Sequence, residues 1–127
     1  MANEKNVFNI KDGVFISTDV IAVICGLSAT ETEGVVSLSN GLSNQEIEKA
    51  SMSRLARSIR LIEHPDRSLT VRLSLQIAYG SAIPEVTANV QQKVKSTVEN
   101  MTGIDVKEVD IRIASIGLQN QEKAKTI

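Results

Sequence analysis

Four valines recur at every fourth position between residues 86 and 98, and this stripe constrains the fold of the 127-residue chain more than any other feature. The stripe consists of Val86, Val90, Val94 and Val98, and Met101 extends it. Spacings of three and four place side chains on one face of an α-helix. Valine is a weak helix former, so a helix built on it depends on packing against other elements. The stripe therefore predicts a helix that lies against a sheet.

Both ends of this helix carry recognisable signals. Pro84 suits the first helical position, because its ring fixes φ and its missing N–H would have no partner there. Glu85 places a negative charge at the positive end of the helix dipole. Gly103 is suited to a left-handed cap at the other end. We predict a helix from residue 84 to about residue 102.

The segment before this helix alternates strictly between apolar and polar residues. One face is predicted to be buried, and it carries Leu69, Val71, Leu73, Leu75, Ile77 and Tyr79. The other is predicted to face water, and it carries Thr70, Arg72, Ser74, Gln76 and Ala78. A shorter strand at 59–62 and a turn at 63–68 precede it, which indicates an antiparallel hairpin. After the helix, residues 109–113 alternate again and predict a last strand.

An earlier helix is predicted from Ser17 or Thr18, as its N-cap, to about Glu33. Its large apolar side carries Val20, Ile21, Val23, Ile24 and Leu27. The opposite side is a strip of small residues, where a surface helix would carry charge: Ala22, Cys25, Gly26 and Ala29. Two interpretations remain open. Either the helix is sandwiched inside its own domain, or the strip is an interface with a partner or a second copy.

The remaining signals complete an α+β fold. Residues 14–16 and 35–38 favour short strands, and a capping box at Ser43 and Glu46 favours a short helix from residue 44 to about 52. We expect a small, mainly antiparallel sheet with two main helices on one face and a short middle helix. We predict a loose segment at 1–12, a single domain at 13–117 and a polar tail at 118–127.

Composition narrows the function classes. The chain carries 14 basic and 15 acidic residues, a balance that does not favour a dedicated nucleic-acid binder. One cysteine cannot form an internal disulfide, which fits a reducing cytoplasm. We expect no signal peptide. The longest apolar run, 20–27, is too short to span a membrane, so we expect no direct insertion.

The sequence offers few groups for catalysis. His64 and Cys25 are each unique in the chain, and no set of metal ligands accompanies either. We expect a non-enzyme without metal or cofactor. Arg60, Arg72 and Arg112 fall on the face of the sheet predicted to be wet. That face is a solvated surface by default, and it could instead meet an anionic partner.

A longer pattern of residues resembles a known family. Asp19 to Ile24 and Ala29 to Val35 look like the first helix of the alkaline-shock protein family, envelope-stress proteins of Gram-positive bacteria. The Tyr79-Gly80, Ile83 to Val86 and Met101-Thr102-Gly103 motifs are similar to the second half of that family. The resemblance covers about residues 14–117.

The resemblance implies a cytoplasmic protein without enzyme activity. Such a protein self-associates and collects at the inner face of the membrane through a membrane-anchored partner or paralogues, where it supports envelope homeostasis. The alternative is a KH-like nucleic-acid module that uses Arg60, Arg72 and Arg112. The missing Gly-x-x-Gly loop and the absence of stacking aromatics on that face count against it.

Overall fold

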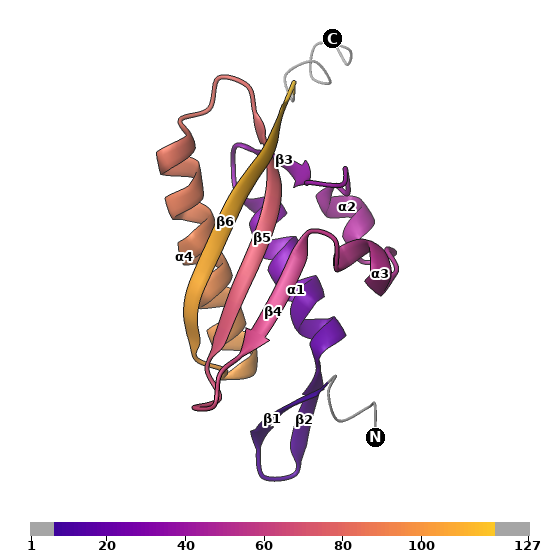
Figure 1. The fold of residues 1–127 in the computed structure, drawn as a ribbon, viewed down its shortest axis with the longest axis vertical. Helices are drawn as coiled ribbons and strands as arrows, with labels where there is room; N and C mark the ends of the chain where they lie inside the picture. The colour runs from indigo at the N-terminus through magenta and orange to yellow at the C-terminus, as the bar shows by residue number, and fades with distance from the viewer. Residues whose placement is uncertain (1–6, 119–127) are drawn as a thin grey trace.

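The computed structural model describes residues 7–118, and these form two α-helices of 14 and 20 residues, two helices of a single turn, and two sheets (Figure 1). The elements follow in the order β1 (Val7–Lys11), β2 (Val14–Ser17), α1 (Thr18–Glu31), β3 (Val35–Leu38), α2 (Asn44–Ile47), α3 (Met52–Leu55), β4 (Ile59–Glu63), β5 (Leu69–Ala78), α4 (Ile83–Thr102) and β6 (Val106–Gly117). The predicted α+β class is confirmed, with both long helices on one face of the larger sheet (Figure 1).

Strand β5 is the centre of the larger sheet. Its first half pairs antiparallel with β4, its second half pairs antiparallel with β3, and its other edge pairs parallel with β6. The predicted hairpin of β4 and β5 and the mainly antiparallel character are confirmed. Strand β6 is longer than the predicted 109–113, and it is parallel to β5 because α4 carries the chain back to the end where β5 began.

Helix α4 covers the sheet with its valine stripe. Val86, Val90, Val94 and Val98 are all buried, and Gly103 caps the helix with a φ of 78°. The prediction that Met101 extends the stripe is wrong, because that side chain is 66% exposed. Thr102 lies four residues after Val98, so it keeps the spacing and is buried instead.

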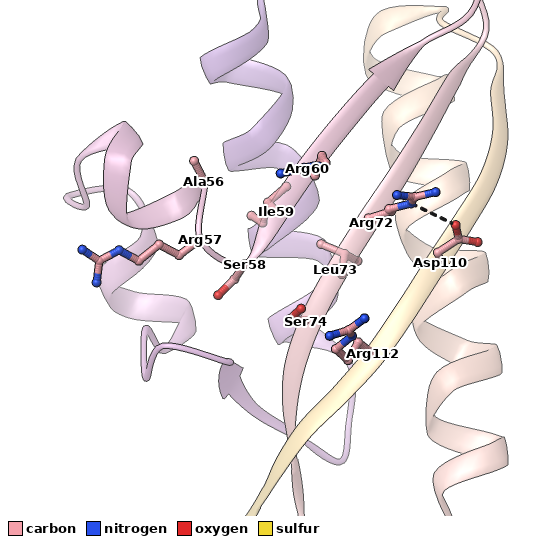
Figure 2. Close-up of a pocket in the computed structure, with 10 residues that line it drawn as sticks. All are labelled: Ala56, Arg57, Ser58, Ile59, Arg60, Arg72, Leu73, Ser74, Asp110 and Arg112. Atoms are coloured by element: carbon pink, nitrogen blue, oxygen red, sulfur yellow. Dashed lines mark hydrogen bonds and ion pairs between the residues drawn. The ribbon is translucent and has the colours of Figure 1, made fainter.

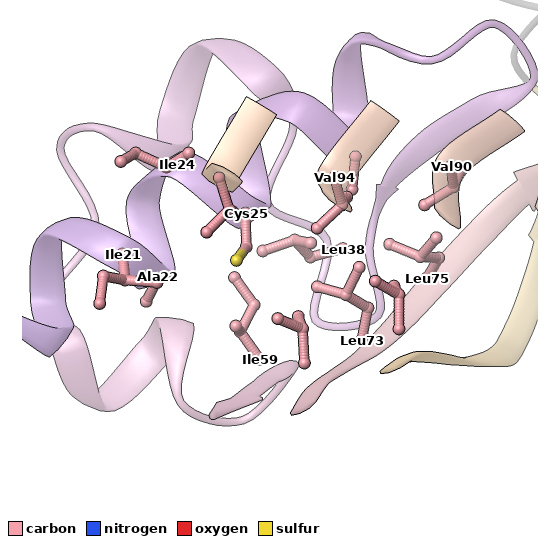
Figure 3. Close-up of a cluster of buried hydrophobic side chains, with 14 of the residues drawn as sticks. Ile21, Ala22, Ile24, Cys25, Leu38, Ile59, Leu73, Leu75, Val90 and Val94 are labelled. Atoms are coloured by element: carbon pink, nitrogen blue, oxygen red, sulfur yellow. The ribbon is translucent and has the colours of Figure 1, made fainter. Parts of the chain in front are cut away.

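Helix α1 lies between two layers of its own domain. It lies between α4 and the short helices α2 and α3, and it also packs against β3 and β4 of the larger sheet (Figure 1). Figure 3 shows the sulfur of Cys25 directed toward Ile59 of β4, and Ile21 and Ile24 of α1 belong to the same buried cluster. The helix is therefore buried around most of its circumference, although Val20 in its first turn is 47% exposed.

The small-residue strip is part of that internal packing. Ala22, Cys25, Gly26 and Ala29 are all buried within the domain. A Cβ atom on Gly26 would lie 3.1 Å from Cδ1 of Ile59 and 3.3 Å from Cδ1 of Ile47. Larger residues would force α1 away from α2 and β4. The strip is thus closed to a partner in this structure, and the interpretation of a sandwiched helix describes it correctly.

The N-terminal segment differs from its prediction. Residues 7–11 are not loose, because β1 pairs antiparallel with β2 and the side chain of Phe8 is buried. Phe8 docks into the core, Ile10 is partly buried, and pairing with β2 completes the order of this strand. The rest of the predicted loose segment before residue 7, and the predicted tail after Leu118, lie outside the described residues.

The middle helix is divided in two. The capping box is present, with the Ser43 N–H donating to Oε1 of Glu46 over 2.9 Å. Helix α2 ends at Ile47, and α3 begins again after Ser51, whose hydroxyl accepts a bond from the N–H of Arg54. The prediction of one helix from 44 to 52 is therefore wrong at its end, because Ser51 supplies a second N-cap.

Burial of the strip predicts the effect of a charge there. Ala29→Arg places an unpaired guanidinium in a site with no exposure, so we expect a loss of about 4 kcal/mol in the free energy of unfolding, or no folding at all. Val20→Arg on the exposed side of the same helix should change it by less than about 0.5 kcal/mol. Urea unfolding followed by circular dichroism measures both. A stable Ala29→Arg variant would contradict this packing.

Candidate functional site

The three arginines predicted to share a face of the sheet do so. Arg60 lies on β4, Arg72 on β5 and Arg112 on β6, and all three are exposed. Arg60 is directly opposite Arg72, and Arg112 is opposite Ser74, the next residue on the same face of β5. Figure 2 shows the three side chains on one side of these strands. This face is turned away from α1 and α4.

A shallow hollow joins these residues to the end of α3. It has a volume of about 360 Å³, and its lining is Ala56, Arg57, Ser58, Ile59, Arg60, Arg72, Leu73, Ser74, Asp110 and Arg112. Arg57 follows α3 and extends away from the three strands in Figure 2. We call the surface formed by Arg57, Arg60, Arg72 and Arg112 the arginine face. Arg57 was not predicted to belong to this surface, because residues 51–58 show no clear periodicity.

Three serines explain why the chain brings Arg57 to the sheet. The N–H of Ser74 donates to the carbonyl of Ser58, and the carbonyl of Ser74 accepts from the N–H of Ser39, each over 2.8 Å. The hydroxyls of Ser39 and Ser58 lie 2.6 Å apart. At Ser74, β5 therefore changes its partner from β4 to β3. The loop that carries Arg57 enters β4 at this junction.

The charges on the arginine face are poorly compensated. Nε of Arg72 lies 3.4 Å from Oδ2 of Asp110, and both side chains are about half exposed, so this pair adds little stability. In the part of the chain that the structure describes, no carboxylate forms an ion pair with Arg57, Arg60 or Arg112. Like charges directly opposite each other on neighbouring strands, such as Arg60 and Arg72, are destabilising. A guanidinium group can bind a carboxylate or phosphate through two parallel hydrogen bonds.

The single histidine and the single cysteine of the chain are not part of the arginine face. Nε2 of His64 lies 2.6 Å from the hydroxyl of Thr70, so this half-buried histidine is tied to the β4–β5 hairpin. Cys25 is fully buried, and burial raises the pKa of its thiol to about 12. Within residues 7–118 there is no cluster of three or more side chains able to hold a metal ion.

Comparison with known proteins identifies the family. The model of the alkaline-shock protein 23 family, which is described as having a cell envelope-related function, matches residues 6–118. The chain belongs to this family. The resemblance to alkaline-shock proteins is thereby confirmed, and the match includes β1, which the predicted domain at 13–117 left out.

Several relatives within the alkaline-shock protein 23 family carry little functional description. The chain is 28% identical to the uncharacterized protein YqhY of Bacillus subtilis, over 90% of this chain and 82% of that one. It is 33% identical to the uncharacterized protein Spy1535 of Streptococcus pyogenes, over 87% of this chain and 83% of that one. A Streptococcus pyogenes protein named "stress response regulator gls24 homolog" is 23% identical over 85% of this chain and 60% of its own length.

Neither the family description nor these names specify a reaction. No solved structure matches the chain. Among the described residues, no helix combines the length and the apolar character that a membrane span requires.

Because Arg60 and Arg72 repel each other across the two strands, an acidic residue at position 60 should stabilise the protein. Arg60→Glu replaces repulsion across the strands by attraction to Arg72, so we expect the free energy of unfolding to rise by roughly 0.5–1 kcal/mol. Lys49→Glu makes the same change in net charge at an exposed site after α2 and should leave stability within about 0.5 kcal/mol of the original. Urea unfolding at low salt measures the difference. A destabilised Arg60→Glu variant would show that Arg60 makes a favourable contact in the folded protein.

The buried thiol predicts a pH dependence of stability. Between pH 9.0 and about 12 the unfolded chain releases the Cys25 proton while the folded chain holds it. The free energy of unfolding should therefore fall by about 1.4 kcal/mol per pH unit in this window, relative to the Cys25→Ala variant. Urea unfolding of both proteins from pH 8 to 11 gives the two slopes. Parallel slopes would mean that the thiol ionises equally well in the folded protein.

Proposed function

We propose that this protein is a non-enzymatic component of envelope stress response and homeostasis, which self-associates and is recruited to the cytoplasmic face of the membrane by a membrane-anchored partner. Its membership of a family with a cell envelope-related function supports the envelope role. The name of the gls24 homolog, a stress response regulator, supports the link to stress. The arginine face is the observation that carries the recruitment step.

The arginine face favours an acidic protein segment as the recruiting partner. It presents guanidinium groups from three strands and one loop around a hollow of about 360 Å³, and a single carboxylate, Asp110, lies among them. Carboxylates of an extended acidic segment would neutralise the repulsion between Arg60 and Arg72. The lining includes no aromatic side chain on which a nucleic-acid base could stack.

An acidic protein segment suits this face better than the surface of a lipid bilayer does. Four arginines on a small, shallow face give a weak and salt-sensitive attraction to a charged bilayer. A membrane-anchored protein can add a fixed spacing of carboxylates and neighbouring contacts, which convert that attraction into specific binding. The same arginines could then serve a paralogue with a different acidic segment.

The location of fluorescent fusions in the native host tests this function. The unsubstituted protein should collect at the membrane, and Arg60→Glu should spread evenly through the cytoplasm, because it places a carboxylate where the partner's carboxylates would bind. Lys49→Glu, with the same change in net charge, should remain at the membrane. A uniform distribution of the unsubstituted protein, or an Arg60→Glu variant that stays at the membrane, would refute recruitment through this face.

Two measurements with purified protein test whether the arginine face binds lipid or RNA instead of an acidic protein segment. Vesicles of phosphatidylglycerol should not sediment the protein at physiological salt, whereas direct lipid binding would do so and remove the need for a protein partner. Single-stranded RNA should bind only weakly, and added salt should remove that binding. Tight RNA binding that Arg60→Glu abolishes would assign the face to nucleic acid instead.

A further inference from the structure

We infer that two copies of this chain join through the free edges of their β6 strands, in antiparallel register about Ile111, to form one continuous sheet. This inference rests on the self-association in the proposed function and specifies its surface. Strand β6 spans Val106–Gly117 and pairs with β5 along one edge. The edge of a sheet exposes N–H and C=O groups that can pair with another strand.

The hydrogen bonds of β6 show which groups lie on its free edge. The side-chain amide of Gln91 donates to the carbonyl of Val109 over 2.9 Å, so that carbonyl points away from β5. Alternate residues of a strand direct their backbone groups to the same edge, so Ile111 and Ile113 also face away from β5. Among the described residues, no hydrogen bond engages these groups of Ile111 and Ile113 on that edge.

Helix α4 protects only the beginning of this edge. The ammonium group of Lys95 donates to the carbonyl of Val106 over 2.7 Å, and the carboxylate of Glu99 accepts from the N–H of Val106 over 2.9 Å. Val106 is therefore closed to a second strand, and the inferred pairing spans Val109 to Ile113 of each copy, centred on Ile111. The strands at the opposite edge of the larger sheet expose less backbone because they are short: β3 has four residues and β4 has five.

The charges near Ile111 match a second copy in antiparallel register. Asp110 and Arg112 flank Ile111 and lie on the arginine face. With Ile111 opposite the partner's Ile111, Asp110 is opposite the partner's Arg112, and the reverse pair follows by symmetry. Opposite charges in such cross-strand pairs are stabilising. Parallel pairing in the same register would instead place each charge opposite its own copy.

The face of β6 that is turned toward the helices also has space for a second copy in this register. Val109, Ile111 and Ile113 point toward the helices, and the last two are only half buried. In the inferred register the partner's Ile113 is opposite Val109. A groove of about 440 Å³ lies there between α4 and β6, with Ala88, Gln91, Gln92 and Val109 in its lining. The partner's Ile113 would enter this groove, and the carbonyl of Val109 can keep Gln91 on its second lone pair.

Disulfide trapping tests the register directly. Directly opposite residues that exchange hydrogen bonds have Cα atoms about 5.5 Å apart, which suits a disulfide. Ile111→Cys should therefore form a covalent dimer under mild oxidation at low protein concentration. Ile113→Cys on the same edge is the matched control, because two copies of residue 113 would lie about 14 Å apart and should stay uncrosslinked. The native Cys25 is fully buried and does not compete.

A charge exchange tests the complementarity. Asp110→Arg and Arg112→Asp each place two like-charge pairs across the axis, so each should weaken dimerisation in sedimentation equilibrium by about tenfold or more. The double variant with both substitutions should restore it to near the original value. It shares with Asp110→Arg the loss of the ion pair to Arg72, so a defect in folding alone would persist in both.

The outcomes separate this inference from the proposed function. An original protein that stays monomeric at all concentrations overturns both. Self-association that neither single charge variant weakens, together with equal trapping at positions 111 and 113, overturns the β6 interface and leaves self-association intact. Trapping at 111 and not at 113, with rescue by the double charge exchange, establishes the β6 interface.

Discussion

The hydrogen-bond ladder of β5 is the constraint on which the rest of the larger sheet depends. Strands β3 and β4 share one edge of β5, and β6 occupies the other, so within residues 7–118 none of these three strands has a pairing partner besides β5. Alternate side chains of β5 form the floor for α1 and α4 on one face and carry Arg72 on the other. A single strand thus fixes both the core and the arginine face. A register shift of one residue would exchange the two faces.

The sequence predicted best those elements whose formation depends on residues close together in the chain. Helix α4 was predicted from its valines, Pro84 and Gly103, and the structure places it within one residue of that range. The alternation in β5 and β4 likewise predicted their pairing. By contrast, the parallel pairing of β6 follows from the path of α4, which alternation in residues 109–113 does not encode. The hairpin of β1 and β2 depends on Phe8 docking into a core that forms from distant residues.

The sequence grouped the three arginines correctly but could not decide the role of the small-residue strip. The reason is again the difference between local pattern and distant contacts. Alternation assigns Arg60, Arg72 and Arg112 to one face whatever packs on the other, so the sequence was sufficient to group them. The strip on α1 gave no such guide, because small residues suit a close internal contact as well as an interface. Its outcome was decided by Ile47 and Ile59, which approach Gly26 from other elements; the sequence predicted those elements but not how they pack against α1. Arg57 was missed because its position depends on the serine junction at Ser74.

The burial of α1 on both sides also has a consequence during synthesis. The helix ends at Glu31, whereas Val94, in the helix that packs beside it, is 63 residues further along the chain. At ribosomal rates of about 5–20 residues per second, α1 waits roughly 3 to 13 s for that partner. During this interval the side of α1 that packs against α4 has no partner to cover it. Apolar surface that stays exposed until α4 is complete makes incomplete chains more prone to aggregation than the finished domain.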